Sequence, residues 1–118
     1  MMQEHLYALL SGAVSFTVAW GSLGSGVGLP RASIFRTSGA RDMHLQGTGL
    51  MQTRVQIDCY GATVEDAHAA ESEIRSVLEG YRGGPILGIF LEAVRDGFED
   101  DTQLLQRVSL TFAVRHRD

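Results

Sequence analysis

Cysteine and histidine are the side chains that most directly suggest chemistry here, either as nucleophile and base or as metal ligands. The chain has one cysteine, Cys59, and four histidines, His5, His44, His68 and His116. A zinc site needs several such ligands at short, defined spacings, and these histidines are scattered along the chain. Cys59 lies at an inward position of an alternating apolar segment, where burial hides a thiol and raises its pKa. We therefore expect a core cysteine and no metal site.

Carboxylates and glycine-rich segments offer further kinds of site. The run Glu99-Asp100-Asp101 lacks the alternating oxygen ligands and distal glutamate of a calcium loop, so it predicts a solvated turn. Residues 21–30 hold four glycines, but no Gly-Lys-Ser/Thr ending follows and the next segment has a strand pattern instead of a phosphate-binding helix start. No nucleophile, base and orienting group can be named together. We expect no enzyme activity and no cofactor.

Two long predicted strands carry polar residues at every second position and form the main candidate for an interaction surface. In residues 50–60 and 104–115 apolar and polar side chains alternate, a period of two that gives each strand an inward and an outward face. The outward residues of interest are Arg54, Gln56, Asp58, Arg107, Ser109, Thr111 and Arg115. Such a face is either a solvated sheet surface or a contact between subunits, where arginine forks and carboxylates fix the register. The sequence favours the two interpretations equally.

The first part of the chain contains a predicted helix and two short strands that precede the strand at residues 50–60. Leucines at helical spacing around residues 6–10 predict the helix, and alternation over residues 16–20 predicts a strand whose aromatic side chains face inward. A second short strand at residues 32–38 is expected to end at Gly39. Residues 40–49 are predicted to be a polar connection.

A second helix and a closing hairpin follow. Thr63 is the expected N-cap of the helix, which places apolar side chains, Val64 included, on its inner face. Its outward residues are expected to be Glu71, Glu73, Arg75 and Glu79.

The hairpin pairs residues 86–95 with residues 104–115 through a turn at residues 96–103 that opens on an Asp-Gly pair. In its first strand, Phe90 and Val94 are expected to share one face. Taken together, the elements predict a single domain over residues 1–118, of the α+β class, with two helices packed on a mainly antiparallel sheet.

Composition limits the classes of function that need to be considered. The chain has 118 residues and a net charge of −4, from 14 acidic residues and 10 basic ones, all of them arginine. This charge lacks the broad cationic footprint of a protein that wraps nucleic acid. The single cysteine indicates a reducing compartment. The apolar residues 6–20 have no preceding Lys or Arg and are too few to cross a bilayer, so we expect neither an export signal nor a membrane partner.

Several segments, taken in order, resemble the tail-completion family of long-tailed phages, prophages and gene-transfer particles, which includes tail-to-head joining and tail-terminator proteins. The resemblance covers nearly the whole chain. Its most specific part is the block Arg-Val-Gln-Ile-Asp-Cys-Tyr-Gly-Ala-Thr at residues 54–63, which leads into a helix. The leucine helix, Val-Ala-Trp-Gly at residues 18–21, Gly-Leu-Pro at 28–30, Ile-Phe-Leu-Glu at 89–92 and Arg-Val-Ser-Leu-Thr-Phe at 107–112 complete the pattern.

The resemblance implies a structural subunit that closes into a hexameric ring, stops tail-tube polymerisation and docks to the head connector, also called the stopper. DNA is then only cargo that passes through the lumen, and an acidic or neutral lining would let it slide, because basic linings bind phosphate. The implied location is the host cytoplasm during assembly and the virion or phage-like particle afterwards.

The implied partners are further copies of the chain, the tail tube protein and the head connector. The loops at residues 21–30, 40–49 and 96–103 are candidates for contacts with tube and connector. The expected subunit or partner contacts are Arg54, Gln56, Asp58, Arg107, Thr111, Arg115, Arg41, Asp42 and His44. The alternative is a ferredoxin-like ligand-binding or regulatory domain, since helices on an antiparallel sheet host many functions.

Overall fold

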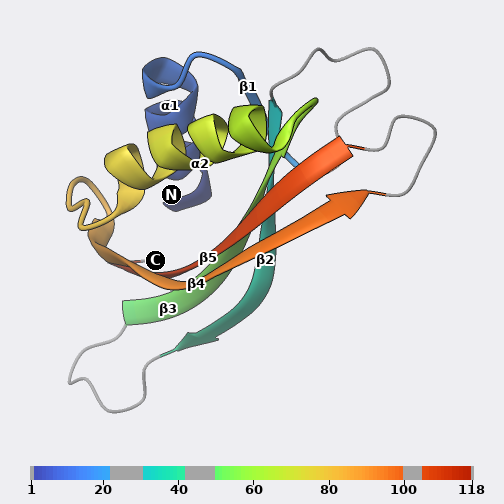
Figure 1. The fold of residues 1–118 in the computed structure, drawn as a ribbon. Helices are drawn as coiled ribbons and strands as arrows, with labels where there is room; N and C mark the ends of the chain where they lie inside the picture. The colour runs from blue at the N-terminus through green and yellow to red at the C-terminus, as the bar shows by residue number, and fades with distance from the viewer. Residues whose placement is uncertain (1, 22–30, 42–49, 100–104, 118) are drawn as a thin grey trace.

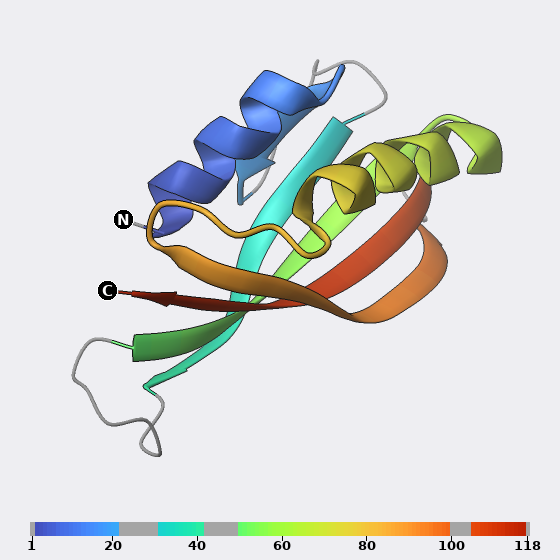
Figure 2. The same ribbon diagram turned by 90° about the vertical axis from the view of Figure 1, so that its left-hand side faces the viewer.

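The computed structural model describes residues 2–21, 31–41, 50–99 and 105–117, which form two helices on one face of a five-stranded sheet (Figures 1 and 2). The elements, in chain order, are α1 (Met2–Ala13), β1 (Thr17–Trp20), β2 (Arg31–Arg41), β3 (Leu50–Gly61), α2 (Val64–Leu78), β4 (Ile86–Glu99) and β5 (Leu105–Arg117). A helical layer on a sheet layer agrees with the predicted α+β class.

The sheet is mixed, with the strand order β1-β2-β3-β5-β4. β1 runs parallel to β2, whereas the pairs β2–β3, β3–β5 and β5–β4 are antiparallel. The prediction of a mainly antiparallel sheet is therefore right except for the β1–β2 pair. The described elements run α-β-β-β-α-β-β, which differs from the β-α-β-β-α-β order of a ferredoxin-like domain.

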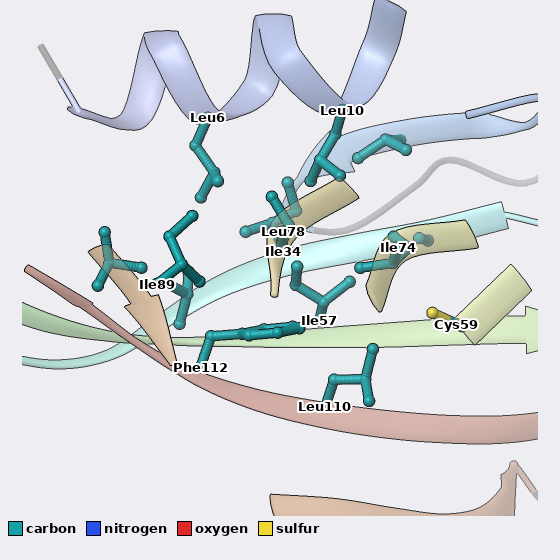
Figure 3. Packing of buried hydrophobic residues seen from close by; sticks show 14 of the residues in the cluster. Leu6, Leu10, Ile34, Ile57, Cys59, Ile74, Leu78, Ile89, Leu110 and Phe112 are labelled. Carbon is teal, nitrogen blue, oxygen red and sulfur yellow. The ribbon is translucent and has the colours of Figure 1, made fainter. Parts of the chain in front are cut away.

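Buried apolar side chains from both helices and from all five strands fill the space between the two layers (Figure 3). Residues at most 1% exposed include Leu6, Leu10, Ile34, Ile57, Ile74, Leu78, Ile89, Leu110 and Phe112. Each such side chain contributes about 1.5–3 kcal/mol when it leaves water, so this cluster holds the helices on the sheet. The inward faces predicted for β3 and β5 are confirmed, since Val55, Ile57 and Cys59 of β3 and Leu110, Phe112 and Val114 of β5 belong to the cluster.

The start of α2 lies close against the end of β3. The Oγ1 of Thr63 accepts a hydrogen bond from the backbone N–H of Asp66 at 3.1 Å, which confirms the predicted N-cap. Gly61 is buried under this first turn, where a Cβ would lie 2.5 Å from the backbone nitrogen of Ala67. A side chain at this position would collide with backbone, so the close contact between β3 and α2 depends on glycine.

β2 is longer than predicted, because Gly39 does not end it. The strand runs to Arg41, and Gly39 pairs with Thr53 of β3. A glycine can remain in a strand where the partner strand supplies hydrogen bonds, and the pairing with β3 is regular from Ser38 to Arg41. The predicted polar connection at residues 40–49 is therefore wrong for its first two residues, and residues 42–49 lie outside the described part.

β4 also departs from prediction, because the Asp96-Gly97 pair continues the strand. Asp96 pairs with Val108 and Gly97 with Arg107 of β5, so the hairpin extends to Glu99. The neighbouring strand overrides the local turn preference of Asp-Gly. The remainder of the expected turn, residues 100–103, lies outside the described residues.

The side assigned to Val94 is wrong for a related reason. The register of β4 shifts between Leu91 and Ala93, and an extra residue in one strand sends later side chains to the other face. Phe90 pairs with Ala113, whereas Val94 pairs with the core residue Leu110. The two side chains therefore lie on opposite faces of the sheet.

The predictions for two residues of α2 are wrong. Glu71, predicted to face outward, is only 8% exposed and accepts a hydrogen bond from Arg75 at 3.1 Å, which allows a carboxylate to sit at the flank of the core. Val64, predicted to face inward, is 54% exposed. It lines a pocket of about 170 Å³ between the start of α2 and the β4–β5 hairpin, and this space leaves it uncovered.

Candidate functional site

The helices cover one face of the sheet, and no described element covers the other, which we call the open face (Figures 1 and 2). Directly paired strand residues point to the same side of a sheet, so the registers define this face row by row. Its described side chains are Arg31, Ser33, Phe35, Gln52, Arg54, Gln56, Asp58, Tyr60, Phe90, Glu92, Ala93, Arg95, Arg107, Ser109, Thr111, Ala113, Arg115 and Arg117.

The structure brings the predicted contact residues of β3 and β5 together on this face. Gln56 pairs with Thr111, Asp58 with Ser109 and Tyr60 with Arg107, while Arg115 pairs with Gln52. Arg54, Gln56, Asp58, Arg107, Thr111 and Arg115 thus form one surface, as the alternation predicted.

The other three predicted contacts, Arg41, Asp42 and His44, are not among the described side chains. The backbone of Arg41, the last residue of β2, pairs with Met51 of β3. Asp42 and His44 lie outside the described residues. Of the proposed contact loops, residues 22–30, 42–49 and 100–103 are also outside them.

Arg54 and Glu92 form an ion pair across the open face. The Nε of Arg54 lies 2.8 Å from Oε1 of Glu92, and Nη2 donates to Oε2 at 3.4 Å. The hydrogen bond and charge of Glu92 raise the pKa of Arg54. Glu92 is not among the contact residues predicted from the sequence. Its position two residues after Phe90 could have identified it, because such residues share one side of an extended strand.

Asp58 is buried although no described helix lies over it. Its exposed fraction is 6%, that of the neighbouring Ser33 is 4%, and Nε2 of Gln56 donates to Oδ1 of Asp58 at 2.9 Å. Ser33, Asp58 and Ser109 pair in one row across three strands. This row of the open face is therefore buried within the single chain, where long side chains on neighbouring strands can cover it.

Aromatic and arginine side chains stack at one end of the open face. The guanidinium carbon of Arg31 lies 5.6 Å from the ring centroid of Tyr60, within the range of a cation–π contact. Tyr60 pairs with Arg107, which pairs in turn with Gly97. A Cβ at Gly97 would lie 3.1 Å from Nη2 of Arg107, so the glycine leaves room for the guanidinium over β4.

Charge is divided between the two sides of the molecule. Of the side chains that the structure describes on the open face, six are arginines and two, Asp58 and Glu92, are carboxylates. On the helix side, residues 64–79 contain five carboxylates and one arginine, Arg75. The chain is acidic overall, yet the open face is basic, which the net charge did not predict. The sequence interpretation missed Arg31, Arg95 and Arg117 as members of this face.

Cys59 is a core residue, as predicted. It is 0% exposed, and burial, together with the nearby charges of Glu71 and Asp58, raises the pKa of its thiol to about 12. A protonated, inaccessible thiol cannot act as a nucleophile near neutral pH.

The histidines within the described residues make separate structural contacts. His116 is buried and lies 2.8 Å from the Thr53 hydroxyl, whereas His5 lies 2.8 Å from the Tyr81 hydroxyl. His68 is exposed, 3.4 Å from a carboxylate oxygen of Asp96. No group of three or more His, Cys, Asp and Glu side chains within residues 2–21, 31–41, 50–99 and 105–117 could hold a metal ion. His44 lies outside these ranges.

A pocket of about 360 Å³ lies at the β1 edge of the sheet, beside the half-buried Trp20. It is lined by Gln3, Trp20, Gly21, Ile34, Phe35 and Arg36. The polar side chains in this lining are Gln3 and Arg36. Ligand sites usually combine an apolar wall with several convergent polar groups, so this pocket offers limited means of orienting a ligand.

Within the described part of the chain, neither helix has the length and apolar character needed to cross a membrane. Neither a family model nor a curated protein sequence matches this chain. A solved structure does match: a chain from a structure titled "Virion of native gene transfer agent (GTA) particle" is 17% identical, with a TM-score of 0.61. The match covers 96% of this chain and 84% of that chain. The chain therefore shares its fold, over nearly all of its length, with a component of a gene transfer agent virion.

Proposed function

We propose that this chain is a structural subunit of a phage-like particle, and that copies of it close into a ring that ends the tail tube and joins it to the head connector. The observation that carries the proposal is the fold shared with a chain of a gene transfer agent virion, at a TM-score of 0.61 over 96% of this chain. A match over nearly the full length supports a subunit of comparable size and architecture.

The open face gives a second line of support, because it has the composition of a protein contact surface. Arginine and aromatic side chains are enriched in protein interfaces, and lysine is depleted there. The described side chains of the open face include six arginines together with Phe35, Tyr60 and Phe90. A face of this kind fixes the register of a contact without requiring a strongly apolar monomer.

The partners in this proposal are other copies of the chain, most simply six in a ring, with the tail tube protein on one side and the head connector on the other. DNA passes through the lumen as cargo, and the chain has no catalytic role. Assembly takes place in the host cytoplasm, after which the ring is part of the virion or phage-like particle.

Electron microscopy of the purified chain, mixed with the tube protein of the same particle, tests the proposal. We expect closed rings seated on one end of each tube, and tubes that no longer elongate from that end. Heterologous contacts that close on themselves produce such rings. Isolated dimers that persist at every concentration and leave the tubes free to grow would contradict the proposal.

The second candidate function is a ligand-binding domain, and the pocket beside Trp20 is the observation that favours it. A bound small molecule would raise the melting temperature by mass action. A thermal-shift screen with a small-molecule panel tests this candidate, with Trp20→Ala as the variant that should lose any shift. A ligand whose shift depends on Trp20 would support it, and a flat response across the panel would count against it.

A further inference from the structure

Three arginines of the open face are exposed and available for an external partner. Arg95, Arg115 and Arg117 are exposed, and none takes part in the ion pairs formed among the described residues. They extend from β4 across to the end of β5. An exposed cationic surface on an acidic protein attracts anionic surfaces and sets the orientation of their approach.

The rest of the open face favours a protein partner over a phosphate backbone. Phe90 is 54% exposed among the arginines, and its neighbour Glu92 places a carboxylate in the same surface. A carboxylate repels phosphate, and an exposed aromatic ring gains little from a sugar-phosphate chain. Both groups are ordinary components of protein contacts, in which aromatic residues are enriched.

A complementary surface exists on the same molecule, on the outer side of α2. Glu65, Asp66 and Glu79 are exposed there, with the small residues Ala69, Ser72 and Ser76 between them. Small side chains allow another surface to approach closely, and the negative carboxylates are opposite in charge to the arginines of the open face. The sheet lies between this surface and the open face, so one molecule cannot bring the two together (Figures 1 and 2).

We propose that the open face of one copy docks on the outer side of α2 of the next copy, through Arg95 and Arg115 on one side and Glu65 and Glu79 on the other. This inference rests on the proposed ring and specifies the contact that builds it. Because the two surfaces differ, the contact is head-to-tail, and repetition closes a ring when the rotation between copies returns to the first copy.

Two double variants and one control test the contact in sedimentation velocity over a range of protein concentrations. Arg95→Gln with Arg115→Gln removes charge from the open face, and Glu65→Gln with Glu79→Gln removes charge from α2. The control, Arg36→Gln with Arg82→Gln, makes the same charge change as the first variant at exposed positions away from the open face. Each test variant is expected to weaken self-association by about tenfold, equivalent to about 1.4 kcal/mol, while the control associates like the unmodified chain.

Mixing the two test variants separates a head-to-tail contact from a symmetric one. One variant retains the carboxylates of α2, and the other retains the arginines of the open face. An equimolar mixture can therefore form one intact contact between unlike variants, and it is expected to give 1:1 pairs that grow no further. A mixture that associates no better than either variant alone would overturn the inference. So would a control as weak as the first variant, or an unmodified chain that stays monomeric throughout.

A DNA-binding measurement and an assay of rings on tail tubes complete the test. If a short DNA duplex binds the unmodified chain but not the Arg95→Gln/Arg115→Gln variant, while self-association is equal in both, the open face binds polyanions and the inference is wrong. If that variant caps tubes with rings as well as the unmodified chain does, the inference fails and the proposed function stands. If the unmodified chain forms no rings on tubes, the proposed function fails, and the pairing of the two variants still decides the contact.

Discussion

The guanidinium of Arg54 on β3 reaches across β5 to the carboxylate of Glu92 on β4, with 2.8 Å between Nε and Oε1. The pair joins two strands that are not neighbours, and Glu92 lies at the register shift between Leu91 and Ala93. It therefore stabilises the open face where the edge strand is irregular.

Replacing Glu92 by glutamine is expected to lower the melting temperature only slightly, because exposed ion pairs contribute little to stability. The side chains of Arg54 and Glu92 are 48% and 35% exposed. Thermal denaturation at low and high salt measures the effect, and the small difference from the unmodified chain should shrink as salt screens the pair. A large loss that is insensitive to salt would show that the pair anchors β4.

Gly61→Ala is expected to destabilise the fold by about 1–3 kcal/mol or more, as overpacking does in a tight core. The added Cβ would lie 2.5 Å from the nitrogen of Ala67, a backbone atom that can move only if α2 shifts. Gly12→Ala is the matched control, since nothing lies within 4 Å of a Cβ there and alanine favours the helix by about 1 kcal/mol. In urea unfolding, Gly61→Ala should be less stable than the unmodified chain and Gly12→Ala should be more stable. Equal stabilities of the two variants would contradict the close contact.

Phe112→Ala and Phe90→Ala compare the two faces of the sheet with the same chemical change. Phe112 is 0% exposed, so its loss is expected to cost about 3–5 kcal/mol. Phe90 is 54% exposed on the open face, so its loss should change the free energy of unfolding by less than about 1 kcal/mol. Phe90→Ala should instead weaken self-association in sedimentation experiments. Unchanged association would show that Phe90 does not take part in the contact between copies.

The raised pKa of Cys59 predicts that the free energy of unfolding falls as the pH becomes alkaline. Its folded pKa, about 12, lies above the ordinary value of 9.0, so its contribution to stability is complete below pH 9 and is lost as the pH rises toward 12. The loss is at most about 1.4 kcal/mol per pH unit in that window. Urea unfolding at pH 8 and pH 10.5 should show a smaller pH dependence for Cys59→Ala than for the unmodified chain.

Labelling of the same thiol provides an independent check. At pH 8 a disulfide reagent should react with Cys59 only when the chain is unfolded in urea, because the native sulfur is buried and protonated. Rapid labelling of the native chain would mean that the β3–α2 region opens readily.

Much of the fold follows from local patterns in the sequence. The alternation in β3 and β5 identifies both faces, and Thr63 identifies the start of α2, because these signals act over a few residues. The grouping of Arg54, Gln56, Asp58, Arg107, Thr111 and Arg115 also follows, once the two strands are known to pair.

The remaining features depend on pairing between distant segments. The continuation of β4 through Asp96 and Gly97, and the shift that separates Val94 from Phe90, are set by β5 and not by the local sequence. The burial of Asp58 results from side chains on three strands, and that of Glu71 depends on the position of α2 relative to the sheet. The alternation of apolar and polar residues is read along one strand at a time. It therefore does not reveal where a register shift relative to the neighbouring strand occurs.

The length of tails in particles assembled without this chain tests the central claim most directly. A ring that ends the tube and joins it to the head predicts tubes of uncontrolled length and filled heads without tails, as measured by electron microscopy. Restoring the unmodified chain should return both tail length and attachment. Tails of normal length, firmly attached to filled heads in the absence of the chain, would contradict the claim.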